Sequence, residues 1–267
     1  MKQFERMFAG IFALTLLMSS GCRNDDENER VEKCEMDDTI RRGEYVLVND
    51  GGAQAYTLCI FDDPKTQTFG WTWAEIVPAP PKSSTTIRAY LFYGQPNHYN
   101  VPPALWESGS TTPDLPVEVK ELTSFTITYD VDVFTTSDYA LGVSTNNFGC
   151  AVGNCGGAFL SIVLDSSEYD PPAAAYFQEQ MTIRGEAYDF YLDTSNLGFP
   201  RYEFVKVKPS SVGTLNLYAI LKYLDEKGYR AVFPRIAFLN FFQDIEGGGS
   251  GSTTIHTYSI DIQSRVQ

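Results

Sequence analysis

The stretch "SFTITYDVDVF", residues 124–134, alternates apolar and polar side chains without a break. The apolar side chains at every second position are Phe125, Ile127, Tyr129, Val131 and Val133. Because successive side chains of a β-strand point to opposite faces, this pattern predicts a strand with one buried face.

Eleven other segments are rich in β-branched and aromatic residues, and many of them also alternate. They are separated by Gly, Pro, Asn and Ser clusters such as "VNDGG" and "IVPAPPKSS". The segments are 44–49, 55–61, 68–73, 85–94, 139–145, 158–164, 179–185, 187–192, 201–208, 235–243 and 254–262. So many strands without intervening helices predict an all-β, two-sheet sandwich.

One segment, "TLNLYAILKYLDEKG", departs from the strand pattern. Leu217, Ile220, Leu221 and Leu224 have helical spacing, and Gly228 is placed to end a helix. We therefore expect one helix in the C-terminal half of a single domain that covers residues 41–267.

The N-terminus reads as a targeting segment. Lys2 and Arg6 precede a short apolar run and then small residues, which is typical of a signal peptide over residues 1–21. The segment resembles a bacterial lipoprotein signal with Cys22 acylated, and an ordinary secretory peptide is the alternative. The polar, acidic residues 22–40 predict a flexible tether and are similar to the export tag of Bacteroides-type surface lipoproteins. We expect a lipid-anchored protein of the outer membrane, exposed at the cell surface.

The formal net charge of −14 at pH 7 argues against a nucleic-acid partner and is compatible with a neutral ligand. Leaving out Cys22, four cysteines remain in an oxidising compartment, and three pairings are possible. We favour Cys34–Cys59 and Cys150–Cys155. No metal site or cofactor is expected, because only His98 and His256 are present and neither is near a cysteine pair.

The order of motifs resembles glycoside hydrolase family 12, the endo-acting β-glucanases and xyloglucanases with a curved β-jelly-roll. The resemblance runs from Cys34 to Ile262. It rests on Cys34, "GEYVLVND" and Cys59, then "FGWTW", "IRAY", "DLPVEVKELTSFTITYD", "YLDEKGY" and "GSGSTTIHTYSIDI".

The resemblance implies two facing carboxylates, one that attacks the sugar and one that donates a proton. The family's nucleophile strand, E-[IL]-M-I-W-L, matches "FLSIVL", which puts Phe159 at the glutamate. A third acid of the family corresponds to Gly142. The acid/base motif meets "FFQDIEGGGSG": an ungapped count reaches Ile245, and one deletion reaches Glu246. The resemblance thus implies a catalytically lapsed relative, with Glu246 as the one remaining acid/base candidate.

A lapsed relative would bind a neutral β-glucan-type polysaccharide without cutting it. Sugar rings stack on aromatic faces, and Phe69, Trp71 and Trp73 alternate along one strand. The other binding candidates are Trp106 in the long segment 94–116, Asn49 and Gln243.

Two alternatives stay open. The first is an active retaining endo-β-glucanase or xyloglucanase in which Glu168 or Glu179 supplies the nucleophile. The second is an accessory surface lipoprotein without a sugar ligand. We expect a monomer, and an outer-membrane glycan importer is a conceivable partner.

Overall fold

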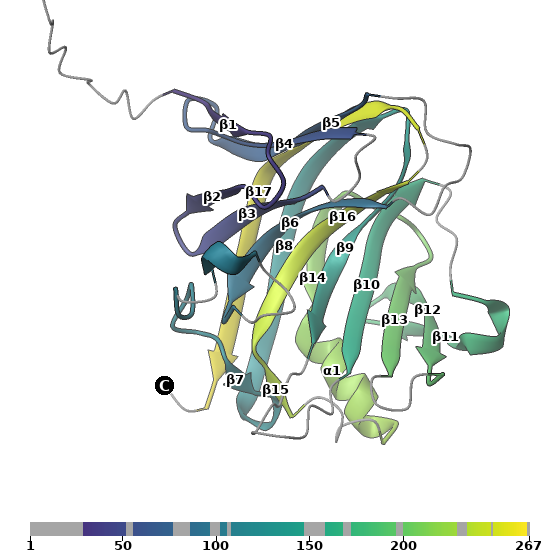
Figure 1. Cartoon of the computed structure of the whole chain (residues 1–267). Helices are drawn as coiled ribbons and strands as arrows, with labels where there is room; N and C mark the ends of the chain where they lie inside the picture. Colours follow the sequence, from purple (N-terminus) through teal and green to yellow (C-terminus); the bar gives the residue numbers. More distant parts are fainter. Residues whose placement is uncertain are drawn as a thin grey trace, which may run out of the picture.

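The computed structural model describes residues 29–51, 56–76, 86–96, 102–105, 108–146, 158–167, 172–195, 200–228, 234–246 and 248–265. These residues form a sandwich of two curved, packed sheets with one α-helix across one end (Figure 1). The predicted fold class, an all-β two-sheet sandwich with one helix in the C-terminal half, is confirmed.

The strands and helices follow one another along the chain. They are β1 (Val31–Lys33), β2 (Thr39–Arg42), β3 (Tyr45–Asp50), β4 (Tyr56–Asp63), β5 (Thr68–Glu75), β6 (Ile87–Gly94), η1 (Pro103–Leu105), β7 (Val117–Glu118), η2 (Val119–Glu121), β8 (Leu122–Thr135), β9 (Asp138–Asn146), β10 (Phe159–Ser167), η3 (Ala174–Tyr176), β11 (Phe177–Ile183), β12 (Glu186–Asp193), β13 (Arg201–Lys206), β14 (Val212–Asn216), α1 (Leu217–Glu226), β15 (Arg235–Ile236), β16 (Phe238–Glu246) and β17 (Ser250–Ser264).

A six-stranded sheet has the order β1-β4-β5-β17-β8-β14, and a nine-stranded sheet has the order β11-β12-β13-β10-β9-β16-β6-β3-β2. Strands β7 and β15 form a separate pair. In β8 the apolar side chains that alternate in the sequence face the nine-stranded sheet, and Phe125, Ile127 and Val131 have no exposed surface. The alternation therefore identified the core face of this strand correctly.

Helix α1 carries the four predicted apolar residues on its buried side. The Asn216 side chain caps its first turn by accepting a hydrogen bond from the Ala219 N–H, at 2.8 Å. Gly228 follows the helix with a φ of +87°, a conformation that glycine adopts more easily than other residues.

The N-terminal boundary differs from the predicted one. Strand β1 pairs with β4 within residues 31–33, inside the segment predicted as tether. The predicted Cys34–Cys59 disulfide is present and attaches this segment to β4. Residues 1–28, which include the predicted signal peptide and Cys22, lie outside the described residues.

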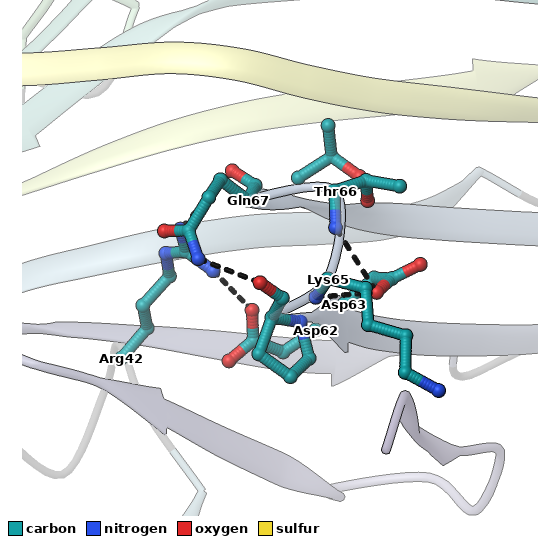
Figure 2. A network of polar contacts seen from close by, with 8 residues as sticks. Arg42, Asp62, Asp63, Lys65, Thr66 and Gln67 are labelled. Carbon is teal, nitrogen blue, oxygen red and sulfur yellow. Dashed lines mark hydrogen bonds and ion pairs between the residues drawn. The ribbon is translucent and has the colours of Figure 1, made fainter. Parts of the chain in front are cut away.

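Polar contacts join the two sheets near the turn between β4 and β5, as Figure 2 shows. Arg42, in β2 of the nine-stranded sheet, pairs with Asp62 in β4 of the six-stranded sheet. It also donates to the carbonyl oxygen of Gln67, at 3.1 Å, in the turn between β4 and β5. Asp63 accepts hydrogen bonds from the Lys65 and Thr66 N–H groups and so orders the same turn.

A buried amide in the core, that of Gln243, connects the two sheets. The Gln243 Oε1 atom in β16 accepts hydrogen bonds from Trp71 Nε1 and Thr253 Oγ1, each at 2.5 Å. Trp71 and Thr253 belong to the six-stranded sheet, so the Gln243 amide connects the two layers.

Of the described helices, none is long and apolar enough to cross a bilayer.

Candidate active site

The outer face of the nine-stranded sheet, which points away from the six-stranded sheet, presents the charged side chains of interest. In β16, Leu239, Phe241 and Ile245 pack into the core between the sheets. Because side chains alternate along a strand, Asp244 and Glu246 point to the outer face.

Glu246 has a carboxylate neighbour on the next strand. The pairing of β16 with β9 puts Glu246 directly opposite Asp138, and both residues are exposed. Residues opposite each other in an antiparallel pair share a face, and their Cβ atoms lie about 4.5–5.5 Å apart. The Thr86 Oγ1 lies 3.5 Å from the Glu246 Oε1. Two carboxylates on adjacent strands therefore point to the same side.

A second charged group adjoins this pair. Arg88 in β6 binds Asp244 through two hydrogen bonds, Nε to Oδ1 at 2.5 Å and Nη2 to Oδ2 at 2.7 Å. Burial lowers the pKa of the Arg88 guanidinium, but the hydrogen bonds to Asp244 and the charges of Asp244 and Asp50 raise it above its ordinary value overall. Burial raises the pKa of the Asp50 carboxyl group, and the charge of Arg88 opposes that rise.

Gly142 occupies a site without room for any side chain. A Cβ atom there would lie 2.4 Å from the backbone oxygen of Ile162 and 3.1 Å from Cζ of Phe242. Phe242, opposite Gly142 in the sheet, packs over it. An aspartate cannot be placed at residue 142 without moving β10.

The outward side chains of β10 are Phe159, Ser161 and Val163, because Leu160, Ile162 and Leu164 pack in the core. The Arg201 guanidinium lies 5.5 Å from the centre of the Phe159 ring. Asp165 follows a bulge and accepts a hydrogen bond from the Tyr139 hydroxyl, at 2.8 Å.

The strand pairing puts Phe159 and Glu246 far apart, although the motif match assigned the two catalytic positions to them. Phe159 lies opposite Asn146 of β9, and Glu246 lies opposite Asp138 of the same strand. Asn146 and Asp138 are eight residues apart, which is about 27 Å along an extended strand. A carboxylate in place of Phe159 could not work together with Glu246, so the motif match does not locate the nucleophile.

The predicted aromatic binding stripe lies in the core. Phe69, Trp71 and Trp73 do share one face of β5, but that face packs against the nine-stranded sheet, with exposed fractions of 4%, 0% and 2%. Their rings have no surface to offer a sugar. The correction follows from the alternation itself, which predicts a common face without telling which face is open.

The two predicted polar binding residues are also internal. Gln243 forms the contact between the sheets described above, and Asn49 donates from Nδ2 to the Leu58 carbonyl oxygen at 2.5 Å. Both side chains are buried, at 0% and 1% exposure. They hold strands together and do not reach the outer face.

The remaining candidates divide into two groups. Glu179 binds Tyr223 and Lys227 beside helix α1, at 2.5 and 2.6 Å, and therefore does not face Glu246. Five further residues lie outside the described part of the chain: His98, Trp106, Cys150, Cys155 and Glu168.

Two further groups of side chains remain, one on the outer face of the nine-stranded sheet and one on the six-stranded sheet. On the outer face of the nine-stranded sheet, Leu105 of η1 packs on a second buried apolar cluster. The cluster consists of Val46, Val48, Tyr90, Phe92, Phe238 and Phe242. A cluster of possible metal ligands, Glu32 with Cys34 and Cys59, has its two sulfur atoms in the disulfide and cannot bind a metal through thiolates.

The sequence analysis missed Asp138, Asp244 and Arg88. The signal was available for the two acids, because the alternation in "FLNFFQDIE" and "SDYALGV" puts them opposite the apolar residues of each strand. Strand pairing was needed to bring Asp138 beside Glu246 and Arg88 beside Asp244.

Comparisons with known proteins show that solved structures share this fold. No protein-family model and no curated protein sequence matches the chain. A family 12 xyloglucanase from Bacillus licheniformis is similar in structure, with a TM-score of 0.69 and 14% identity over 87% of this chain and all of that one. An endoglucanase from Rhodothermus marinus has a TM-score of 0.67 and 17% identity, over 88% of this chain and 99% of that one. The xyloglucanase domain of a type three effector from Sinorhizobium fredii, in complex with cellobiose, has a TM-score of 0.63 and 11% identity. The match covers 86% of this chain and 100% of that one.

At this level of identity the comparisons establish the architecture. The described residues have the jelly-roll sandwich of the family 12 glycoside hydrolases.

Proposed function

We propose that this protein is a retaining glycoside hydrolase that acts on a neutral β-glucan-type polysaccharide, with Glu246 as the acid/base. The observation that carries the proposal is the position of Asp138 directly opposite Glu246 on the outer face, in a chain with this fold. Retaining glycosidases need two carboxyl groups about 5–5.5 Å apart. Residues directly opposite on neighbouring strands have Cβ atoms about 4.5–5.5 Å apart, so the carboxyl groups of Asp138 and Glu246 can reach that spacing.

The proposed reaction has two steps. A carboxylate attacks the anomeric carbon while Glu246 donates its proton to the leaving oxygen, so that a glycosyl ester forms and the glycosidic bond breaks. Glu246 then takes a proton from water, which attacks the anomeric carbon; the ester bond breaks, the sugar is released and the nucleophile leaves as a free carboxylate. The chain offers two carboxylates for the nucleophile: Asp138, and Glu168, which follows Ser167 at the end of β10 in the sequence.

The test is hydrolysis of mixed-linkage β-glucan and xyloglucan, measured as reducing ends released. Loss of general acid/base catalysis costs about 10²–10⁴-fold, so Glu246→Gln should lose activity on that scale. Glu226→Gln is the matched control, because Glu226 lies on α1 and pairs only weakly with Lys222, at 3.8 Å.

A fluorosugar that traps the glycosyl ester identifies the nucleophile. Mass spectrometry of peptides should find the adduct on Asp138 or on Glu168, and Asp138→Asn and Glu168→Gln should separate the two. If the wild-type protein releases no reducing sugar and forms no adduct, the hydrolase proposal is wrong.

A lapsed, glycan-binding relative is the second candidate, and the outward side chains of β10 favour it. Phe159, Ser161 and Val163 include no carboxylate. This candidate predicts retarded migration of the protein in native gels that contain β-glucan, without hydrolysis. A protein that neither cuts nor is retarded would be the accessory lipoprotein without a sugar ligand.

The location is part of the proposal. A lipid on Cys22 would hold the protein at the outer membrane surface, where large polysaccharides are accessible and an importer could take up the fragments. Radiolabelled palmitate should enter the wild-type protein and not Cys22→Ala, and the variant should leave the detergent phase. Labelling of both would contradict the lipid anchor.

A further inference from the structure

A row of polar side chains crosses the outer face of the nine-stranded sheet at a level that the proposed reaction does not use. Asn240 of β16 lies opposite Ser144 of β9, which lies opposite Ser161 of β10. Ser161 in turn lies opposite Glu203 of β13. In each strand a direct neighbour of the polar residue packs in the core, so the four side chains point outward together. These four residues form the polar row.

The polar row is buried although it lies on the outer face. The exposed fractions are 9% for Asn240, 2% for Ser144, and 5% for both Ser161 and Glu203. The Asn240 Oδ1 atom, moreover, has no hydrogen-bond partner in the described part of the chain. A buried acceptor without a partner destabilises a fold, and such atoms are rare in native proteins unless a bound molecule satisfies them. The row therefore holds an unused hydrogen-bond acceptor at a fixed place.

Apolar side chains border the row on the same face. Along β10, Phe159 lies two residues before Ser161, which is about 7 Å along the strand. Along β16, Phe238 and Phe242 flank Asn240 in the same way. The Phe159 ring is partly exposed, so an aromatic surface lies beside the polar groups.

The row is long enough to contact several groups of one ligand. It spans four adjacent strands, and neighbouring strands lie about 4.7–4.9 Å apart, so its length is about 14 Å. Its members are spaced regularly because the strand pairing sets their positions.

The chemistry of the row selects the class of ligand. One amide, two hydroxyls and one carboxylate provide more acceptors than donors, so the ligand must donate hydrogen bonds. The Glu203 carboxylate and the net charge of −14 disfavour an anion, and an apolar ligand would leave the Asn240 oxygen unpaired. Sugar hydroxyls both donate and accept, and the apolar face of a sugar ring can pack on an aromatic side chain such as Phe159.

We propose that the polar row is a binding site for the hydroxyl groups of a neutral sugar, separate from the Glu246 site. Asn240 lies six residues before Glu246 in β16, which is about 20 Å along the strand. The inference rests on the proposed function only for the class of ligand, a neutral glycan. The row would hold a glycan whether the protein cuts the polymer or only binds it.

The test measures sugar affinity and stability in the same variant, in a Glu246→Gln background so that the sugar is not cut. Isothermal titration with cellotetraose should show about tenfold weaker binding after Asn240→Val, because the acceptor is lost. The unfolding temperature should not fall, because hydrocarbon of similar size replaces an unpaired buried oxygen. A lower unfolding temperature with unchanged affinity would show a structural role and overturn the inference.

A smaller change keeps the test valid if Asn240→Val does not fold. Ser161→Ala removes one hydroxyl of the row and should weaken cellotetraose binding about threefold. The matched control is Ser259→Ala, because Ser259 is an exposed serine of β17 in the other sheet. Its affinity should equal that of the parent, and equal affinities of the two serine variants would contradict the proposed site.

The side-chain amide of Asn240 reports the ligand without any turnover. In ¹⁵N-labelled protein its NMR signals are the pair missing from Asn240→Val, and cellotetraose should shift them to saturation. A shift with glucosamine alone would assign the row to a cationic ligand, and no shift with either sugar would also refute the inference. If the wild type releases no reducing sugar from glucan, the hydrolase proposal fails while this titration still decides the polar row.

Discussion

Gly142 illustrates how much one residue can mislead when it is read from a motif. The match to a catalytic acid suggested a loss of function, whereas the structure shows that a Cβ atom at residue 142 would collide with the Ile162 carbonyl oxygen of β10 and crowd the Phe242 ring. The residue type was visible in the sequence. The reason for it depends on the Ile162 carbonyl of a neighbouring strand, which no local pattern reveals.

We expect Gly142→Ala to destabilise the protein by about 1–3 kcal/mol, as other overpacked positions do. Thermal unfolding followed by circular dichroism should show a fall of roughly 2–10 °C. Since the closest contact is with backbone, adding Phe242→Leu should not restore stability. An unchanged unfolding temperature in Gly142→Ala would contradict the close approach.

At the scale of elements, the long strands and the helix could be predicted and the short strands could not. All twelve predicted segments contain a strand, and α1 buries the four residues expected of it. The sequence analysis missed β1, β2, β7 and β14, which have two to five residues each. So few residues give little periodicity, and their pairing partners determine their conformation.

The Glu179 contacts predict a pH dependence for the attachment of α1 to β11. Hydrogen bonds from Lys227 and Tyr223 lower the pKa of the Glu179 carboxyl group below its ordinary value of 4.5. The stabilisation is therefore complete at neutral pH and is lost as the pH falls below about 4.5.

Glu179→Gln should consequently lower the unfolding temperature more at pH 7 than at pH 3. Glu226→Gln is the control, because its exposed pair with Lys222 contributes little at either pH. Equal effects of Glu179→Gln at the two pH values would mean that the ion pair does not stabilise the helix.

The Cys34–Cys59 disulfide predicts a second effect at this scale. It closes a chain segment with a sequence separation of 25. Removing a cross-link of this span costs about 3 kcal/mol, chiefly through the unfolded chain. Denaturant titration of Cys34→Ala/Cys59→Ala should show a loss of about that size, and a loss below about 1 kcal/mol would contradict it.

At the scale of the whole molecule, the sandwich could be predicted and the site could not. Strand content and the order of motifs suggested the architecture that the solved structures share. The site depends on register, because a shift of a few residues between β9, β10 and β16 decides which carboxylates face one another. Phe159 was aligned with a motif of one strand, and that alignment contained no information on its distance from Glu246.

The net charge of −14 and the outward carboxylates predict a preference for neutral glycans. Binding of carboxymethylated glucan should be about tenfold weaker than binding of hydroxyethylated glucan at low ionic strength. The difference should shrink as salt is added, since exposed charges are screened. Isothermal titration at about 20 and 500 mM salt measures this, and equal affinities at low salt would contradict the prediction.

The attachment of β1 has a mechanical consequence. If a lipid holds Cys22 while a long glucan pulls on the outer face, tension enters the domain through the residues before β1. Strand β1 is an edge strand of three residues, and without the disulfide it would separate from β4 at low force. The sulfur–sulfur bond transmits that load directly to β4, whose neighbours on the six-stranded sheet share it. An anchored protein could thus remain folded while it holds a polymer in flowing liquid.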